Sequence, residues 1–249
     1  MKLFKRIGAL LIGALMGMGT ALAAAMPPEQ QIDILAQNII GSNGWLVEPL
    51  YDANCDKWYY AVTDLNHDGN LEILKAKNGF NNDIVELQCD ELVEGKGIRH
   101  VDIKLKAGSY NHIPDIMSGE SAKQPGVVYN PKTREYYYIF NEVIMHSEFD
   151  STTTLYAISL DKTLSIEALA SMIWRLSGYD GTVTHLFYRN NPFPEVISQE
   201  QYKACIKERF PDCTEAGGQI KWYSADEVYD YMDMDKVNQL LMESYKEFR

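Results

Sequence analysis

Two kinds of hydrophobic spacing divide the chain, helical spacing near the ends and strand-like alternation between them. Near the start, Ile32, Leu35, Ala36 and Ile39 recur at i, i+3, i+4 and i+7. This spacing gives one apolar face and predicts a helix over about 29–40. From about 57 to 188, runs of β-branched and aromatic residues alternate with polar ones and are separated by short turn segments.

The alternating runs predict a series of strands. They fall at about 58–63, 71–77, 84–89, 98–106, 127–129, 136–143, 152–160, 164–176 and 183–188, with 164–176 as one strand or two short ones. Most of the connections are tight, and parallel strands need long crossovers. We therefore predict an antiparallel β-meander over about 57–188.

Helical patterns return in the C-terminal part, about 197–249. Ser198 with Gln201 and Ser224 with Glu227 have the spacing of capping boxes, which open helices. Asp233 or Asp235 is the expected cap of a last helix that runs to about Phe248. No linker separates these parts. The pattern predicts one α+β domain over 26–249, a meander flanked by an N-terminal helix and C-terminal helices.

Residues 1–25 have the pattern of a Sec-type signal peptide. Three basic residues precede an apolar run, and Ala21-Leu22-Ala23 or Ala23-Ala24-Ala25 supplies a small-residue cleavage site. An uncleaved membrane anchor is the alternative. After residue 25 no run reaches the length of a membrane span. We expect a periplasmic or secreted protein.

Charge and cysteines narrow the class of protein further. The formal net charge is −12, which argues against nucleic acid as a partner. The four cysteines, in an exported chain, predict two disulfides, for which we favour Cys55–Cys89 and Cys205–Cys213. The competing interpretation is a four-cysteine zinc site, but no C-x-x-C spacing supports it.

The clearest chemistry lies between two predicted strands, in the loop Asp64-Leu65-Asn66-His67-Asp68-Gly69-Asn70-Leu71-Glu72. Side-chain oxygens fall at alternate positions, and Gly69 allows a sharp bend. This spacing is typical of a Ca²⁺ site, because calcium takes six to eight oxygen ligands. The predicted ligands are Asp64, Asn66, Asp68, the Asn70 carbonyl and Glu72. His67 is expected to face solvent.

Two observations bear on the kind of loop. An EF-hand needs a glutamate at position 12, where this chain has Lys75, and its flanks are helices. We therefore predict a short strand–loop–strand site. The alternative is a hairpin turn rich in Asp and Asn that binds no ion.

Catalytic signals are weak. His112, Asp115 and Ser118 lie in a long loop at 107–124, and His146, Glu148 and Asp150 lie close together before a strand. A secreted or periplasmic hydrolase using His112 or His146 is thus an alternative function. The chain has no G-x-S-x-G and no H-E-x-x-H motif.

The stretch YYAVTDLNHDGNLEIL resembles a class of exported bacterial proteins that carry a Y-A-x-x-D-[ILV]-[DN]-x-D-G-x-x-E-[IL] loop, related to loops in FG-GAP and VCBS-type modules. A looser match lies at 196–202, before a predicted helix. The resemblance implies an exported calcium-binding α+β domain and no reaction. We expect a binding protein whose partner is an extracytoplasmic protein or glycan. An exported structural protein without metal is the further alternative.

Overall fold

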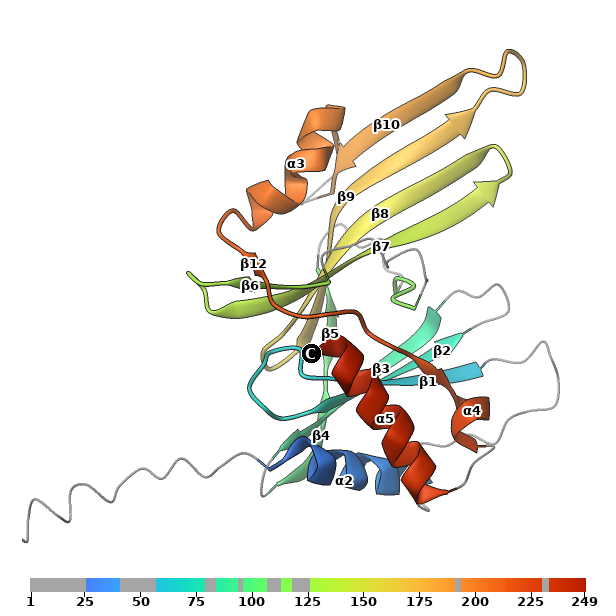
Figure 1. Ribbon diagram of the computed structural model, residues 1–249. Coiled ribbons are helices and arrows are strands. Elements are labelled where there is room, and N and C mark those ends of the chain that lie inside the picture. The colour runs from blue at the N-terminus through green and yellow to red at the C-terminus, as the bar shows by residue number, and fades with distance from the viewer. Residues whose placement is uncertain are drawn as a thin grey trace, which may run out of the picture.

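Two β-sheets and four helices make up the part of the chain that the computed structural model describes (Figure 1). The described residues are 26–40, 57–78, 84–93, 96–106, 113–117, 126–190, 194–229 and 233–249. The predicted signal peptide lies outside them. No described helix has the length and apolar character needed to cross a membrane.

The smaller sheet is built from the first strands of the chain. It contains β1 (Lys57–Thr63), β2 (Glu72–Asn78), β3 (Ile84–Val93), β4 (Gly97–Val101) and β13 (Tyr223–Ser224). Its order is β13-β1-β2-β3-β4, and all pairs are antiparallel. The hairpin β1–β2 keeps a regular register from Lys57 opposite Asn78 to Thr63 opposite Glu72. That register brings Glu72 to the base of the predicted calcium loop.

The larger sheet follows in the chain. It contains β6 (Gly126–Asn130), β7 (Glu135–Ser147), β8 (Asp150–Leu160), β9 (Leu164–Leu176), β10 (Val183–Arg189), β11 (Glu195–Ile197) and β12 (Thr214–Glu215). Its order is β11-β10-β9-β8-β7-β6-β12. A short strand, β5 (Ile103–Leu105), pairs with β9 in parallel, unlike the antiparallel strands of the predicted meander.

The helices cover the sheets at opposite ends of the molecule. They are α2 (Pro28–Ile40), α3 (Gln199–Arg209), α4 (Ala225–Tyr229) and α5 (Met234–Phe248). Figure 1 shows α2 and α5 against the small sheet and α3 beside the large one. The predicted α+β class, with an N-terminal helix and C-terminal helices, is confirmed. The strands form two sheets where one meander was predicted. Leu164–Leu176 is a single strand, which is one of the two alternatives that the sequence left open.

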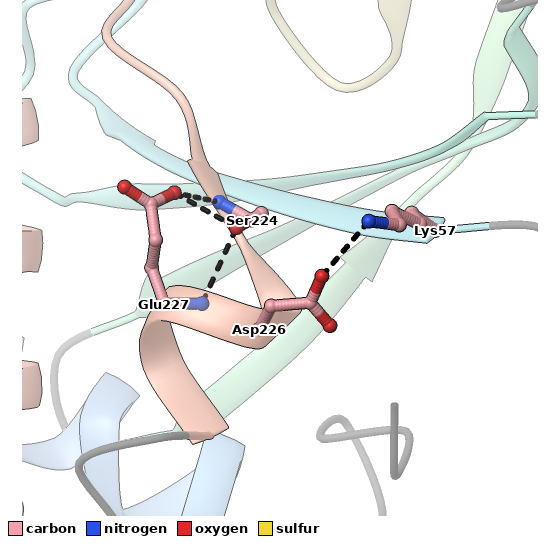
Figure 2. A network of polar contacts seen from close by, with 4 residues as sticks. All are labelled: Lys57, Ser224, Asp226 and Glu227. Atoms are coloured by element: carbon pink, nitrogen blue, oxygen red, sulfur yellow. Dashed lines mark hydrogen bonds and ion pairs between the residues drawn. The ribbon is translucent and has the colours of Figure 1, made fainter. Parts of the chain in front are cut away.

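The predicted helix caps are present. Ser198 Oγ accepts from Gln201 N, while Gln201 Oε1 accepts from Ser198 N. Figure 2 shows the second capping box: Ser224 Oγ accepts from Glu227 N, and the Glu227 carboxylate accepts from Ser224 N and Oγ. Beside it, Asp226 pairs with Lys57 at 3.0 Å, which ties α4 to β1. Asp233 caps α5 through Asp235 N.

Three hydrophobic clusters fill the spaces between these layers. One lies between the sheets, with Leu74 and Cys89 from the small sheet and Phe140 and Ile166 from the large one. A second packs α2 and α5 on the other face of the small sheet. The third packs α3 on the large sheet. The β1–β2 loop therefore leaves a sheet that is buried on both faces.

Candidate functional site

The loop between β1 and β2 is held in shape by its own polar groups. Asp64 Oδ1 accepts from Gly69 N at 3.4 Å, and Asp68 Oδ1 accepts from Asn70 N at 2.8 Å. Asn66 Oδ1 accepts from Asp68 N at 3.2 Å. Gly69 has a φ of 87°, in the left-handed region that glycine enters without steric cost. The carboxylates and amides thus turn toward the inside of the loop.

Glu72 is the most unusual residue of the site. Its side chain is fully buried, and Oε2 accepts from Leu65 N at 2.8 Å and from Thr63 Oγ1 at 3.0 Å. The other oxygen, Oε1, is buried and has no hydrogen-bond partner among the described residues. A buried acceptor without a partner is costly, and more so if it is charged.

The surroundings of the loop raise the pKa values of two of its carboxyl groups and so disfavour their charged forms. Burial and, to a smaller extent, the neighbouring Asp68 raise the pKa of Asp64 to about 6. Burial also raises the pKa of Glu72 well above its usual range, and Asp64 and Asp68 act in the same direction. Two desolvated carboxyl groups therefore lie close to a third carboxylate. A bound cation would favour their charged forms.

The five predicted ligands differ in exposure. Asp64 and Glu72 are buried, Asn66 and Asn70 are half-buried, and Asp68 is exposed. Asn66 Nδ2 also donates to Asp68 Oδ2 at 3.0 Å. In the described part of the chain, no group of three or more His, Cys, Asp or Glu residues is placed to hold a metal ion. Calcium also accepts amide and backbone oxygens, which this loop supplies.

Groups outside the loop fix its position. Gln31 of α2 donates from Nε2 to the carbonyl of Gly69 at 2.7 Å and accepts from Leu71 N at 2.8 Å. A cavity of about 490 Å³ lies against the loop and is lined by Asp64, His67, Asp68 and the end of α5. Helix α2, helix α5 and the hairpin therefore meet at the loop.

His67 does not lie as the sequence indicated. It was expected to face solvent, but its ring stacks on Tyr136 of β7, with centroids 4.0 Å apart. Its side chain is half-buried, its backbone has a φ of 52°, and burial lowers its pKa. The expectation was wrong because Tyr136 comes from the second sheet, far along the chain. His67 joins the loop to that sheet.

The residues of the alternative hydrolase hypothesis are only partly among those that the structure describes. His112 and Ser118 lie outside the described residues, and Asp115 Oδ1 accepts from Met117 N. His146 is exposed on β7, and its Nε2 is hydrogen-bonded to Thr152 Oγ1 at 2.9 Å, not to a carboxylate. Asp150 pairs with Arg175. Among the described residues, no hydrogen bond joins His146 to a carboxylate.

The cysteines also differ from expectation. Cys205 and Cys213 are free thiols in this structure, so the predicted bond between them is not formed. Cys205 lies within α3 and Cys213 lies in the turn after it, and both pack against the hydrophobic cluster between α3 and the large sheet. Cys89 is a free buried thiol, and its expected partner Cys55 lies outside the described residues. Cys89 is part of the core between the two sheets.

A second buried polar group lies in the small sheet and was not predicted from the sequence. Lys75 Nζ contacts Asp90 Oδ2 at 2.6 Å, and Asp90 Oδ1 contacts His100 Nδ1 at 2.8 Å. Lys75 and Asp90 are buried on adjacent strands. The lysine between the apolar residues Leu74 and Ala76 was the available signal. The opposite charges of Lys75 and Asp90 offset each other.

No family model matches the chain, and neither the curated proteins nor the solved structures contain a match. The resemblance to exported proteins with a related loop therefore stays a prediction. The contacts and charges of the β1–β2 loop are therefore the basis for inferring a function.

Proposed function

We propose that this is an exported calcium-binding protein that acts by binding a partner outside the cytoplasm, without catalysis. The observation that carries the proposal is Glu72 at the base of an acidic loop. It is a fully buried carboxylate, and one of its oxygens has no hydrogen-bond partner in the part of the chain that the structure describes. Ca²⁺ is the ligand that such an oxygen lacks. The ion would be held by Asp64, Asn66, Asp68, the Asn70 carbonyl and Glu72.

The chemistry of the donors favours calcium over other metals. All five are oxygens, and calcium and magnesium are the common cations that prefer oxygen ligands. Calcium tolerates irregular loops, whereas magnesium demands near-octahedral geometry. Zinc prefers nitrogen and sulfur. The net charge of −12 also favours a cation over an anionic partner.

The contacts of the loop suggest what calcium would do. Gln31 connects the loop to α2, and His67 connects it to β7 through Tyr136. An ion at the loop would therefore hold the β1–β2 hairpin, the N-terminal helix and the large sheet in one arrangement. The role we propose is to stabilise the protein where calcium is plentiful. The partner, an extracytoplasmic protein or glycan, would contact a surface held in place this way.

Thermal unfolding in calcium and then in chelator tests the proposal. The chain without residues 1–25 should unfold at a higher temperature in calcium, because a ligand that binds only the folded state stabilises it. At 100 times its dissociation constant the gain is about 2.7 kcal/mol. Asp68→Ala should remove the gain, and Asp161→Ala, in the β8–β9 turn, should keep it. An unchanged midpoint in the unsubstituted protein would overturn the proposal.

A further inference from the structure

The face of the large sheet that packs on the small sheet continues beyond it. Side chains alternate along a strand, so Phe140 in the central core shares a face of β7 with Glu142, Ile144 and His146. Phe140 and Glu142 are buried, Ile144 is half-buried, and His146 is exposed. The face thus changes from core to surface along the strands that project away from the small sheet in Figure 1.

A cavity of about 320 Å³ lies on this outer part of the face. Ile144, Ile173, Tyr188 and Pro194 form apolar walls, and hydroxyl groups from β8 and β9 lie among them. Helix α3 packs on the opposite face of the large sheet and does not cover the cavity. The volume is at the lower end of the range for small-molecule sites, about 300–1,000 Å³.

Apart from His146 and two tyrosines, the described residues that line the cavity have no ionisable side chain. Among the described residues that line the cavity there is no Asp, Glu, Lys or Arg. A charged ligand would lose its hydration there without gaining a counter-charge, which is costly. A neutral ligand does not carry this cost of desolvating a charge. The lining therefore selects an uncharged molecule.

Several polar groups of the cavity already have hydrogen-bond partners. Thr154 Oγ1 and Ser171 Oγ are 2.9 Å apart, and Thr152 Oγ1 is bonded to His146. Asn190 donates from Nδ2 to Ser171 Oγ at 2.6 Å. An apolar ligand can cover such hydroxyls at little cost, because they keep their hydrogen bonds.

One acceptor beside the cavity has no partner. Asn190 is fully buried, and its Oδ1 has no hydrogen-bond partner among the described residues. Its amide nitrogen is bonded to Ser171, which lines the cavity. Asn190 is not itself among the residues that line the cavity, so its connection to the cavity runs through Ser171.

We propose that this cavity binds a small neutral molecule, mostly apolar, about the size of one or two fused aromatic rings. Phenols and indoles belong to this class. The site is separate from the calcium loop and does not depend on it.

The fluorescence of N-phenyl-1-naphthylamine tests the proposal, because this neutral probe with one N–H brightens in apolar surroundings. With the chain lacking residues 1–25 at pH 8, we expect saturable brightening. Indole and p-cresol should displace the probe. Benzoate and benzylamine, which are charged at this pH, should not. No brightening, or displacement by the charged compounds equal to that by indole, would overturn the proposal.

Matched variants locate the binding. Thr152→Phe fills the cavity, whereas Thr153→Phe places the same ring on the opposite face of β8. We expect Thr152→Phe to weaken probe binding at least about tenfold, and Thr153→Phe to leave it unchanged. If Thr152→Phe does not fold, Ile173→Trp and its neighbour Met172→Trp form an equivalent pair on β9. Equal binding by both members of a folded pair would place the probe elsewhere and refute the proposal.

Discussion

Replacing Glu72 by glutamine separates a calcium ligand from a purely structural carboxylate. Glutamine keeps an oxygen that can accept from Leu65 N and Thr63 Oγ1, the two bonds that Glu72 makes. It removes the negative charge, and it places an N–H₂ group where Oε1 now lacks a partner. The first change relieves the desolvation that raises the pKa of Glu72, and the second leaves a buried donor unpaired.

The two effects oppose each other in calcium-free protein. A raised carboxyl pKa in the folded state means that stability falls as the pH rises above the unfolded value, so removing the charge stabilises the protein at neutral pH. An unpaired buried donor costs about 1–3 kcal/mol. We expect little net change in the unfolding temperature measured in chelator.

In calcium the two proteins should differ clearly. At a calcium concentration 100 times its dissociation constant, the unsubstituted protein gains about 2.7 kcal/mol. For a chain of this length that corresponds to a rise in unfolding temperature of about 5–11 °C. If the variant binds about 100-fold more weakly, its gain falls to about 0.4 kcal/mol. Differential scanning calorimetry in calcium and in chelator measures both quantities.

Glu142→Gln is the matched control. Glu142 is also a buried carboxylate that accepts from a backbone N–H, that of Asp115, and from a hydroxyl, that of Tyr156. It lies on β7, outside the loop. The control should be destabilised equally with and without calcium and keep the full calcium shift. A full calcium shift in Glu72→Gln would refute the role given to this carboxylate.

Three further outcomes are expected. Ser244→Ala should lower the free energy of unfolding by about 2–3 kcal/mol in denaturant titrations, because the buried hydroxyl accepts from Val62 N and donates to a backbone carbonyl; no loss would contradict this. Arg134→Gly should stabilise the protein by up to about 1 kcal/mol, since Arg134 is exposed with a φ of 60°; a clear loss would show that its side chain matters. In the reduced protein at pH 8, iodoacetamide should modify Cys213 before Cys205, since burial raises the pKa of Cys205 to about 11 and its rate should increase with pH; the reverse order, read by mass spectrometry, would contradict the packing of α3.

The sequence predicted the elements whose signal is local. The apolar face of α2 and the capping boxes at Ser198 and Ser224 depend on neighbours within one or two turns, and they are present. The loop from Asp64 to Glu72 was also located, because ligand spacing is a local pattern. Alternation alone, however, does not indicate which layer covers a strand. For this reason one meander was predicted where the structure has two sheets.

The remaining features depend on residues far apart in the chain. The side chain of His67 was predicted to face solvent because no residue near it in the sequence indicates its contact with Tyr136. Thr152, Thr154 and Ser171 have the pattern of a solvated strand face, yet they line a cavity with Ile144 and its neighbours. The free thiols of Cys205 and Cys213 depend on how α3 packs, which the spacing of two cysteines does not encode.

Isothermal titration of calcium into the chelator-treated chain, without residues 1–25, tests the central claim most directly. The account predicts saturable binding of one calcium ion per chain. It also predicts that the double variant Asp64→Asn and Asp68→Asn, which keeps the hydrogen-bond acceptors of the loop and removes two charges, loses this binding. Absence of binding heat across temperatures in the folded protein, or unchanged binding by the double variant, would contradict it.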